Sequence, residues 1–147
     1  MYGRALTVSV PIALPDAGSL PEEEISRPMK MYDIDCNTVK IDDLLEMTVP
    51  FSFKSDLNVD LHGFATWFEV LFEGSERTLT LTTASKEDTH WAQTLFLYDE
   101  PMPLTQDDTI KGDISFCRKK DNHRCIEVSL SCSVNDSDVI SKKFSIE

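Results

Sequence analysis

The chain has 147 residues, of which 41% are hydrophobic and 27% are charged. This length and composition are typical of a single folded domain with one core. The 14 basic and 26 acidic side chains give a net charge of −12, which argues against nucleic acid as a partner. An acidic surface of this kind can attract basic protein segments, although a merely solvated surface is the commoner case. No apolar run approaches the roughly 18 residues of a membrane-spanning helix, so no membrane association is predicted.

The first 32 residues differ from the rest of the chain. A short apolar run with two prolines is followed by the charged stretch SLPEEEISRP at residues 19–28. Because the apolar run is short and broken by proline, we expect neither an anchor nor a signal peptide. Residues 1–32 are therefore predicted to form a loosely ordered arm or linker, and residues 33–147 to form the folded domain.

The pattern of the next stretches is that of β-strands. Alternating apolar and polar residues predict strands at residues 47–55 and 59–73, and the second strand has apolar side chains on both faces. The expected faces are Phe64, Phe68, Val70 and Phe72 on one side, and Leu61, Ala65, Trp67 and Leu71 on the other. Gly63 is expected to allow a bend in this long strand.

Five further strands complete the predicted fold. They are expected at residues 78–83, 93–101, 108–116, 125–134 and 139–146. The polar link KKDNHR predicts a hairpin, NDSD predicts a turn, and only IDDLLE and EEEIS suggest short helical turns. The chain is therefore predicted to be all-β, an antiparallel β-barrel-like or sandwich domain with a short, loosely ordered N-terminal arm.

Several kinds of site are disfavoured by the sequence. The five glycines are too scattered for a phosphate or nucleotide loop, so this chain by itself is expected to bind no dinucleotide or adenosyl cofactor. His62, His90 and His123 lack the spacing of metal ligands, so no metal site is expected. No GxSxG motif indicates a nucleophilic serine. The four cysteines show no CxxC spacing, which predicts reduced thiols in a cytoplasmic or nuclear protein, while a disulfide between Cys117 and Cys125 stays open.

His90 and Trp91 stand together at the start of a predicted strand. In a β-protein a tryptophan is most often a core residue. His90, however, follows the polar run TTASKEDT, and junctions between a loop and a strand often carry functional polar groups. With Glu87 and Asp88 close by, His90 could titrate near neutral pH or bind a carboxylate. The pattern alone leaves both interpretations open.

Four stretches in this order resemble the C-terminal β-barrel domain of the protein arginine N-methyltransferases. They are HGFATWFEVLFEG, LTLTT, THWAQTLFLYDEPMPL and DDTIKG, and DIDCNTVKIDDL resembles the family's entry into the barrel. The resemblance covers residues 33–147. Thr89, His90 and Trp91 match the family's THW loop, in the form that is similar to the asymmetric-dimethylating class.

The resemblance implies methyl transfer from S-adenosylmethionine to protein arginine. It implies that His90 hydrogen-bonds to an acidic residue of a separate catalytic domain and that Trp91 helps to wall the arginine channel. His90 and Trp91 are thus the expected catalytic residues, and Thr89 and Trp91 the expected substrate-binding residues. The family's cofactor domain, with its glycine-rich motif and glutamate pair, has no counterpart in residues 1–32.

The predicted function is therefore that of the substrate-engaging barrel of an arginine methyltransferase, which acts on arginine-rich proteins. The chain is expected to be a fragment or a truncated member, to bind no S-adenosylmethionine alone and to have no activity alone. The alternative is a non-catalytic acidic β-domain that binds basic protein segments or regulates a full-length methyltransferase by pairing with it. A cofactor domain encoded upstream would favour the first hypothesis.

Overall fold

The computed structural model describes residues 2–13, 26–84 and 93–146. They form strands β1 (Tyr2–Ile12), β2 (Met29–Asp35), β3 (Glu46–Lys54), β4 (Val59–Glu73), β5 (Thr78–Thr82), β6 (Thr94–Leu104), β7 (Thr109–Arg118), β8 (Ile126–Val134) and β9 (Ile140–Ile146), with a 3-10 helix η1 (Asp42–Leu44) between β2 and β3. The strands pair antiparallel, so the predicted antiparallel all-β fold is confirmed. Among the residues described, no helix is long and apolar enough to cross a membrane.

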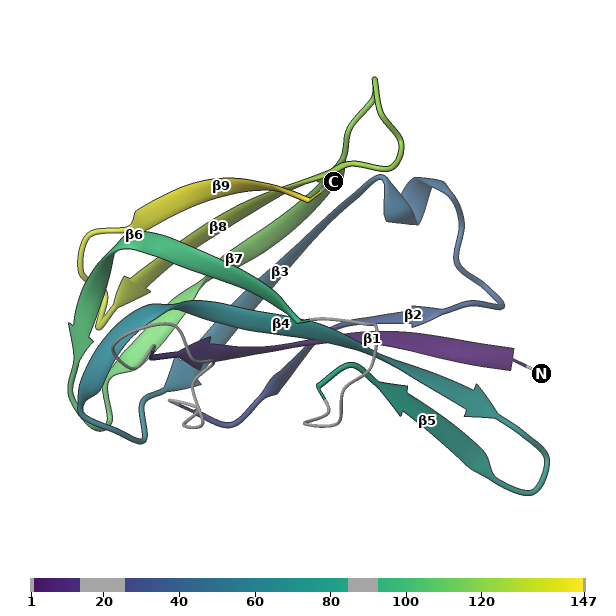
Figure 1. Cartoon of the computed structure of the whole chain (residues 1–147), viewed down its shortest axis with the longest axis horizontal. Coiled ribbons are helices and arrows are strands. Elements are labelled where there is room, and N and C mark those ends of the chain that lie inside the picture. Colours follow the sequence, from purple (N-terminus) through teal and green to yellow (C-terminus); the bar gives the residue numbers. More distant parts are fainter. Residues whose placement is uncertain (1, 14–25, 85–92, 147) are drawn as a thin grey trace.

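The strands are arranged in two sheets (Figure 1). The five-stranded sheet has the order β2-β1-β4-β5, and β6 also pairs with β4; the four-stranded sheet has the order β3-β7-β8-β9. β4 lies at the centre of the first sheet. β1 pairs with β4 along one edge, and β6 and β5 pair with successive parts of its other edge. β6 pairs with residues 59–66 of β4 and β5 with residues 69–73, so the pairing along β4 passes from one strand to the other near its middle.

Strand β1 corrects the prediction that the start of the chain is a loosely ordered arm or linker. Residues 2–12, expected to belong to a loosely ordered arm or linker, pair with β4 from Tyr2 to Ile12, and β2 also begins before the predicted domain boundary. Pro11 made the apolar run look broken. However, the pairing of β1 with β2 ends at Ser9, so Pro11 lies where a missing N–H costs no ladder bond to β2. Residues 14–25 lie outside the described residues.

The main core lies between the two sheets and is centred on Phe64 of β4. Its ring centroid lies 5.0 Å from that of Phe51, 6.0 Å from that of Phe53 and 6.4 Å from that of Tyr98. The other buried members are Met31, Leu61, Phe96, Met102, Leu104, Ile110, Ile114, Val128, Leu130 and Cys132. The alternation predicted for residues 47–55 and 108–116 is confirmed, since its apolar members enter or pack against this core. In residues 125–134 it holds from Val128 onwards, but Ile126, at the start of β8, is 36% exposed and lies outside the core.

One predicted face of β4 is wrong at a single position. Alternation placed Leu61 with Ala65 and Trp67, but Leu61 is fully buried in the main core with Phe64. The register of β4 against β6 shifts between Leu61 and Gly63, and a shift of one residue moves a side chain to the opposite face. The bend expected at Gly63 therefore coincides with an irregularity of the strand.

The turns carry the residues that their backbone requires. Asn135 and Asp136, in the predicted turn NDSD, have φ values of 49° and 60°, a conformation that Asn and Asp tolerate better than other side chains do. The helical turn predicted at IDDLLE is η1. The other predicted turn, EEEIS, falls on residues 22–26, of which only Ser26 is described.

All four cysteines are free thiols, and Cys117 is exposed whereas Cys125 is buried. The disulfide left open between them is therefore not formed. Cys132 lies in the core, where the hydroxyl of Tyr98 donates a hydrogen bond to its Sγ at 3.1 Å. Burial raises the pKa of the Tyr98 hydroxyl and of the Cys132 thiol, so both groups are protonated at neutral pH.

Asp108 joins the loop between β6 and β7 to the turn before β9. Its carboxylate accepts hydrogen bonds from the Thr105 N–H at 2.7 Å, from the Asn135 side chain at 2.5 Å and from the Thr105 hydroxyl at 3.0 Å. These bonds hold the pKa of Asp108 below its usual value. The ionised form is thus favoured by folding.

We expect Asp108→Asn to lower stability in a way that depends on pH. Since the folded pKa lies below the unfolded value of about 3.9, the contribution of Asp108 is present above the unfolded pKa and is lost as pH falls through the folded pKa. Urea unfolding of both proteins should show a larger difference at neutral pH than near pH 3. Asp138→Asn removes an equal charge outside this network and is the control. An Asp108→Asn deficit that persists unchanged in acid would contradict the assignment.

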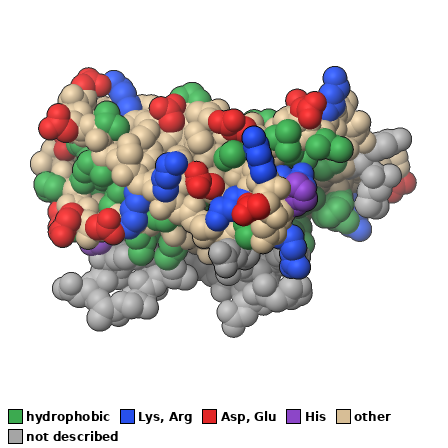
Figure 2. Space-filling view, turned by 90° about the horizontal axis from the view of Figure 1, so that it is seen from above, with side chains coloured by type: hydrophobic (Ala, Val, Ile, Leu, Met, Phe, Trp, Pro, Cys, Tyr) green, Lys and Arg blue, Asp and Glu red, His purple; other side chains and the backbone are tan. Residues whose placement is uncertain are grey.

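The charges are spread over the surface seen from above in Figure 2, where acidic and basic side chains alternate. Among the described residues, four ion pairs link a Lys or Arg to an Asp on another segment, a fifth links Lys30 to Asp33 within β2, and a sixth links Lys143 to Glu127. The net charge of −12 is thus not gathered into a single acidic patch on this face.

Candidate functional site

The segment that contains the predicted site residues leaves the five-stranded sheet beside the middle of β4. β5 ends at Thr82, opposite Glu69, and β6 begins at Thr94, opposite Thr66. Thr89, His90 and Trp91 fall within residues 85–92, which lie outside the described residues. Their assigned roles stay predictions, and the site is built here from the residues that hold the two ends of this segment.

Threonines at the end of β5 fix the first end of the segment. The hydroxyl of buried Thr83 accepts a hydrogen bond from the Phe68 N–H at 3.1 Å and donates to the Phe68 carbonyl at 3.2 Å. The hydroxyl of Thr82 donates to the Glu69 carboxylate at 3.2 Å. Side chains therefore continue the pairing with β4 where the regular ladder stops, so the chain leaves the sheet from a defined position.

Two further hydrogen bonds hold the two ends of the segment, Ala84 and Gln93, which together are called the neck here. The side-chain amide of Gln93 donates to the Ala84 carbonyl at 3.4 Å, and the Ala84 N–H donates to the Thr82 hydroxyl at 3.2 Å. Ala84 and Gln93 flank residues 85–92 on either side. The two ends of the segment are thus joined to each other as well as to the sheet.

A small apolar cluster lies beneath this neck, on the face of β4 opposite Phe64. Ile12, Ala65 and Trp67 are buried there, and the partly buried residues packed against them are Ala84, Leu95 and Leu97. Trp67 is therefore a buried aromatic residue, as predicted, although it belongs to this second cluster. The two clusters confirm that both faces of β4 are covered.

Trp67 differs from an ordinary core residue in one respect. Its side chain is only 8% exposed, yet its indole Nε1 is one of two buried side-chain nitrogens without a hydrogen-bond partner among the described residues. The other is Nε of Arg118, at the far end of β7. A buried N–H normally has an acceptor, so this indole N–H is an exception within an otherwise apolar cluster.

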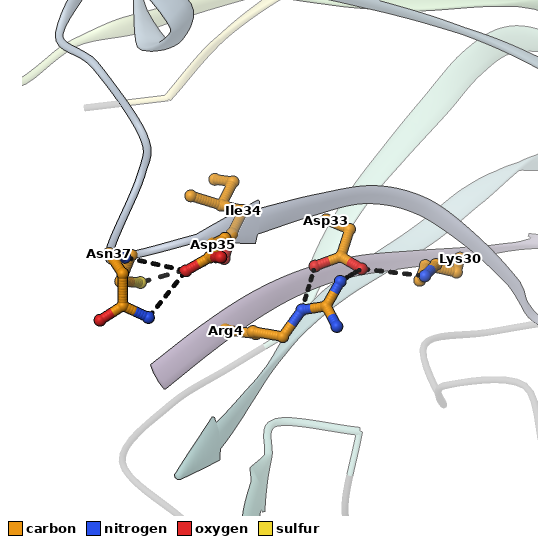
Figure 3. Close-up of polar contacts among 7 residues, drawn as sticks. Arg4, Lys30, Asp33, Ile34, Asp35 and Asn37 are labelled. Atoms are coloured by element: carbon orange, nitrogen blue, oxygen red, sulfur yellow. Dashed lines mark hydrogen bonds and ion pairs between the residues drawn. The ribbon is translucent and has the colours of Figure 1, made fainter. Parts of the chain in front are cut away.

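The same face of the sheet carries a group of charges at the pairing of β1 with β2 (Figure 3). Arg4 donates two hydrogen bonds to the Asp33 carboxylate, at 3.1 and 2.6 Å, and Lys30 donates a third at 3.1 Å. Burial favours a higher pKa for Asp33, but the hydrogen bonds from Lys30 and Arg4 outweigh it and hold this pKa below its usual value. Both carboxylate oxygens of Asp33 are thus hydrogen-bonded to a cation, and the pair with Arg4 joins β2 to β1.

The described residues offer no evident metal centre. No group of three His, Cys, Asp or Glu side chains is placed to hold an ion within residues 2–13, 26–84 and 93–146. Nδ1 of His62 lies 3.0 Å from the Asp60 carbonyl, two residues away on the same strand, and His123 is exposed in the hairpin turn.

The residues that hold the neck were not identified by sequence reasoning. Thr82 and Thr83 fall within the strand predicted at residues 78–83, and Gln93 is the first residue of the strand predicted at residues 93–101. The signal available was the position of polar side chains where a strand ends, which often serve as caps and turns. Their partners lie far away along the sequence or across the segment, and a pattern does not show them.

The fold and the two ends of this segment define a class of protein: an all-β domain of two antiparallel sheets, in which the chain on either side of residues 85–92 pairs with the longest strand, β4. Residues 14–137 match the family model described as the arginine methyltransferase oligomerization subdomain. The chain belongs to this family, and it is a C-terminal barrel domain of the protein arginine N-methyltransferases. The resemblance seen from residue 33 onwards is confirmed, and the match reaches back into the segment predicted as an arm.

Similar proteins include longer arginine methyltransferases. The chain is 32% identical over 126 residues to protein arginine N-methyltransferase 6 of Danio rerio, which covers 85% of this chain and 36% of the relative. It is 36% identical over 115 residues to the Xenopus laevis enzyme of the same name, covering 78% and 34% of the two chains. The chain thus spans about a third of the length of these relatives.

Solved structures share the fold. An open conformation of Arabidopsis thaliana protein arginine methyltransferase 10 superposes with a TM-score of 0.87 at 21% identity, over 99% of this chain and 60% of that chain. A Trypanosoma brucei enzyme-prozyme heterotetrameric complex with AdoHcy gives a TM-score of 0.86 at 16% identity, over 98% and 56% of the two chains. At these identities the likeness concerns the fold alone.

Proposed function

We propose that this chain serves as the substrate-engaging barrel portion of a protein arginine N-methyltransferase, with His90 and Trp91 as its site residues. The observation that carries the proposal is the neck between Ala84 and Gln93, which fixes the ends of residues 85–92 on a rigid sheet. A histidine that must meet a carboxylate of another domain needs a fixed starting position, because hydrogen bonding tolerates little misplacement.

The proposal assigns chemistry to three neighbouring side chains. His90 donates a hydrogen bond to a carboxylate of the catalytic domain, Trp91 forms one wall of the channel that receives the substrate guanidinium, and Thr89 supports both. A flat aromatic wall suits a guanidinium, which is planar and stacks on aromatic rings. S-adenosylmethionine, the methyl donor, is bound by the catalytic domain.

The isolated 147-residue chain is expected to transfer no methyl group. Methyl transfer requires donor and acceptor to be held in line, and the scattered glycines of this sequence form no nucleotide-binding loop. Incubation with labelled S-adenosylmethionine and an Arg-Gly-rich peptide should give no more labelled peptide than a protein-free sample. Titration of S-adenosylmethionine into the chain in a calorimeter should give no binding heat.

A full-length arginine methyltransferase, such as the Danio rerio relative, is the positive control for both measurements. Robust labelling by the isolated chain would refute its inactivity and would place a cofactor site within these residues. Binding heat without labelling would refute only the statement about the cofactor.

A second function is favoured by one of the structural neighbours. The Trypanosoma brucei neighbour is a complex of an enzyme with a prozyme, and the family is described by its role in oligomerization. This chain would then regulate a full-length methyltransferase by pairing with it. A pull-down with such an enzyme should succeed, and His90→Ala or Trp91→Ala should abolish it, while His123→Ala should not. If the chain were pulled down equally well with all three substitutions, residues 90 and 91 would not be the contact with the enzyme.

A further inference from the structure

The turn between β7 and β8 carries a local excess of positive charge. Residues 118–124, Arg-Lys-Lys-Asp-Asn-His-Arg, contain four basic side chains and one acidic side chain, Asp121, and are called the basic turn below. Residues 120–124 are exposed, and Figure 1 shows the turn projecting beyond the four-stranded sheet. Its charge is therefore opposite in sign to the net charge of −12 of the chain.

The cations of the basic turn differ from most of the others in having no acidic partner. The basic side chains that are ion-paired with an Asp or Glu are Arg4, Lys30, Lys54, Lys111, Lys142 and Lys143. Within residues 2–13, 26–84 and 93–146, no ion pair involves residues 118–124. Glu127, which follows the turn on β8, is paired with Lys143 instead, and Lys119 donates to the neutral hydroxyl of Ser145 at 2.9 Å. Grouped like charges repel one another, and a local arrangement that opposes stability often belongs to a functional surface.

Hydrogen bonds within the basic turn fix its backbone. The Lys119 N–H donates to the Cys125 carbonyl and the Cys125 N–H donates to the Asn122 carbonyl, both at 3.0 Å. The side-chain oxygen of Asn122 accepts a hydrogen bond from the Arg124 N–H at 3.1 Å, as asparagine often does in turns. The exposed side chains of Lys120 and Arg124 are thus attached to a backbone of defined shape.

Arg118, at the end of β7, has exposed apolar neighbours on both sides. Its N–H donates to the Leu45 carbonyl at 2.9 Å, and it lies opposite Ile126 of β8. Because side chains alternate along a strand, Arg118 shares a face with Phe116, which packs against the main core. Leu45 is 44% exposed and Ile126 36%. Accessible apolar side chains therefore lie next to an arginine at this end of the sheet.

The guanidinium of Arg118 lacks the partner that its position requires. Its Nε is buried without a hydrogen-bond partner among the described residues. A buried donor that is left without an acceptor costs stability. A guanidinium carries five N–H donors in a planar fork, and this fork matches the two oxygens of a carboxylate. A carboxylate is therefore the group that best complements this position.

We propose that this end of the four-stranded sheet binds an acidic segment of another protein. A carboxylate of the segment binds the guanidinium of Arg118, and an apolar side chain next to it packs on Leu45 and Ile126. Further carboxylates of the segment bind Lys120 and Arg124. A short peptide is favoured over a larger polyanion, because it meets only charges within about 10 Å, the screening length near physiological salt. A nucleic acid or a membrane would also face the acidic remainder of the chain.

Fluorescence anisotropy of a labelled peptide tests the proposal on the intact chain. The probe is a fluorescein-labelled peptide of about twelve residues, rich in Glu and containing two Leu. At about 50 mM salt it is expected to bind with a Kd of about 10–100 µM. At about 0.5 M salt binding should weaken by about ten-fold or more, because the charges are screened. The same peptide with Gln in place of Glu should not bind.

Two pairs of substitutions separate local charge from overall charge. Lys120→Gln combined with Arg124→Gln changes two exposed side chains and should weaken binding by about ten-fold or more. Lys54→Gln combined with Lys111→Gln removes the same charge from ion-paired positions elsewhere and should change the Kd by less than about two-fold. Arg118→Lys keeps the charge but loses the fork, so it should also weaken binding. Circular dichroism verifies that each variant is folded.

Three results would overturn the proposal. One is the absence of binding up to about 1 mM protein, and another is an equal loss of affinity for the two double variants. The third is tighter binding of duplex DNA or phosphatidylserine vesicles than of the peptide, lost on the same substitutions. His90→Ala should leave peptide binding unchanged, because residue 90 lies between two strands of the other sheet. A failure here is therefore distinct from a failure of the proposed function.

Discussion

Gly63→Ala is expected to lower the free energy of unfolding by about 3 kcal/mol or more. A Cβ at this position would collide with the carbonyl oxygen of Phe96 and would also press on Cα of Leu97 at 2.9 Å. Both are backbone atoms of β6, so no side chain can turn aside to make room. Chemical unfolding followed by circular dichroism measures the loss.

The consequence extends to the candidate site, because Gly63 sets how closely β6 approaches β4. Gly3→Ala is the control, since its Cβ would approach only the Leu71 carbonyl, at 3.3 Å. A much smaller loss is expected there. Equal losses for the two variants would show that the close approach of β6 to β4 is not what Gly63 protects.

Phe64→Ala is expected to lower the free energy of unfolding by about 3–5 kcal/mol, the range for removal of a large buried aromatic side chain. Phe64 is 1% exposed and its ring is surrounded by those of Phe51, Phe53 and Tyr98. The truncation removes contacts on several sides and leaves a cavity between the two sheets. The urea midpoint at neutral pH reports the change.

Phe72→Ala provides a matched comparison, because the residue type, the strand and the face are the same. Phe72 is 37% exposed, so its truncation should cost about 1 kcal/mol or less when measured on dilute, monomeric protein. If both variants lost the same stability, the main core could not be centred on Phe64.

Much of the fold was predictable from the sequence because one face of most strands meets a core. In β3, Phe51 and Phe53 are buried while Ser52 and Lys54 are exposed, and such alternation is visible in the sequence itself. Leu61 was misplaced because its face depends on a register shift against β6. Gly63 indicates an irregularity at this point, but the shift itself depends on how two separate strands pair, which the sequence of neither strand shows.

The N-terminal strand shows a different reason for failure. Proline in an apolar run argues against a strand when the strand is assumed to have neighbours on both sides. Whether Pro11 has two neighbours depends on where the pairing with β2 stops, which is a property of the assembled sheet. The family resemblance reached the correct fold without settling this point.

For the candidate site, the sequence identified the motif and the structure identified its supports. The triplet of Thr89, His90 and Trp91 is contiguous and could be recognised directly. The supports join residues such as Phe68 and Thr83, or Ala84 and Gln93, which become neighbours only in the folded chain. Trp67 could be predicted as buried, but only the folded structure shows that its indole N–H has no hydrogen-bond partner among the described residues.

The closure between Ala84 and Gln93 also bears on how such a domain can change over evolutionary time. The hydrogen bonds that hold the ends of residues 85–92 are made by Thr82, Ala84 and Gln93, outside the segment itself. Selection can then alter the sequence of this octapeptide without altering the residues that fix its two ends. The neck thus separates the residues that position the segment from the residues that carry its predicted chemistry.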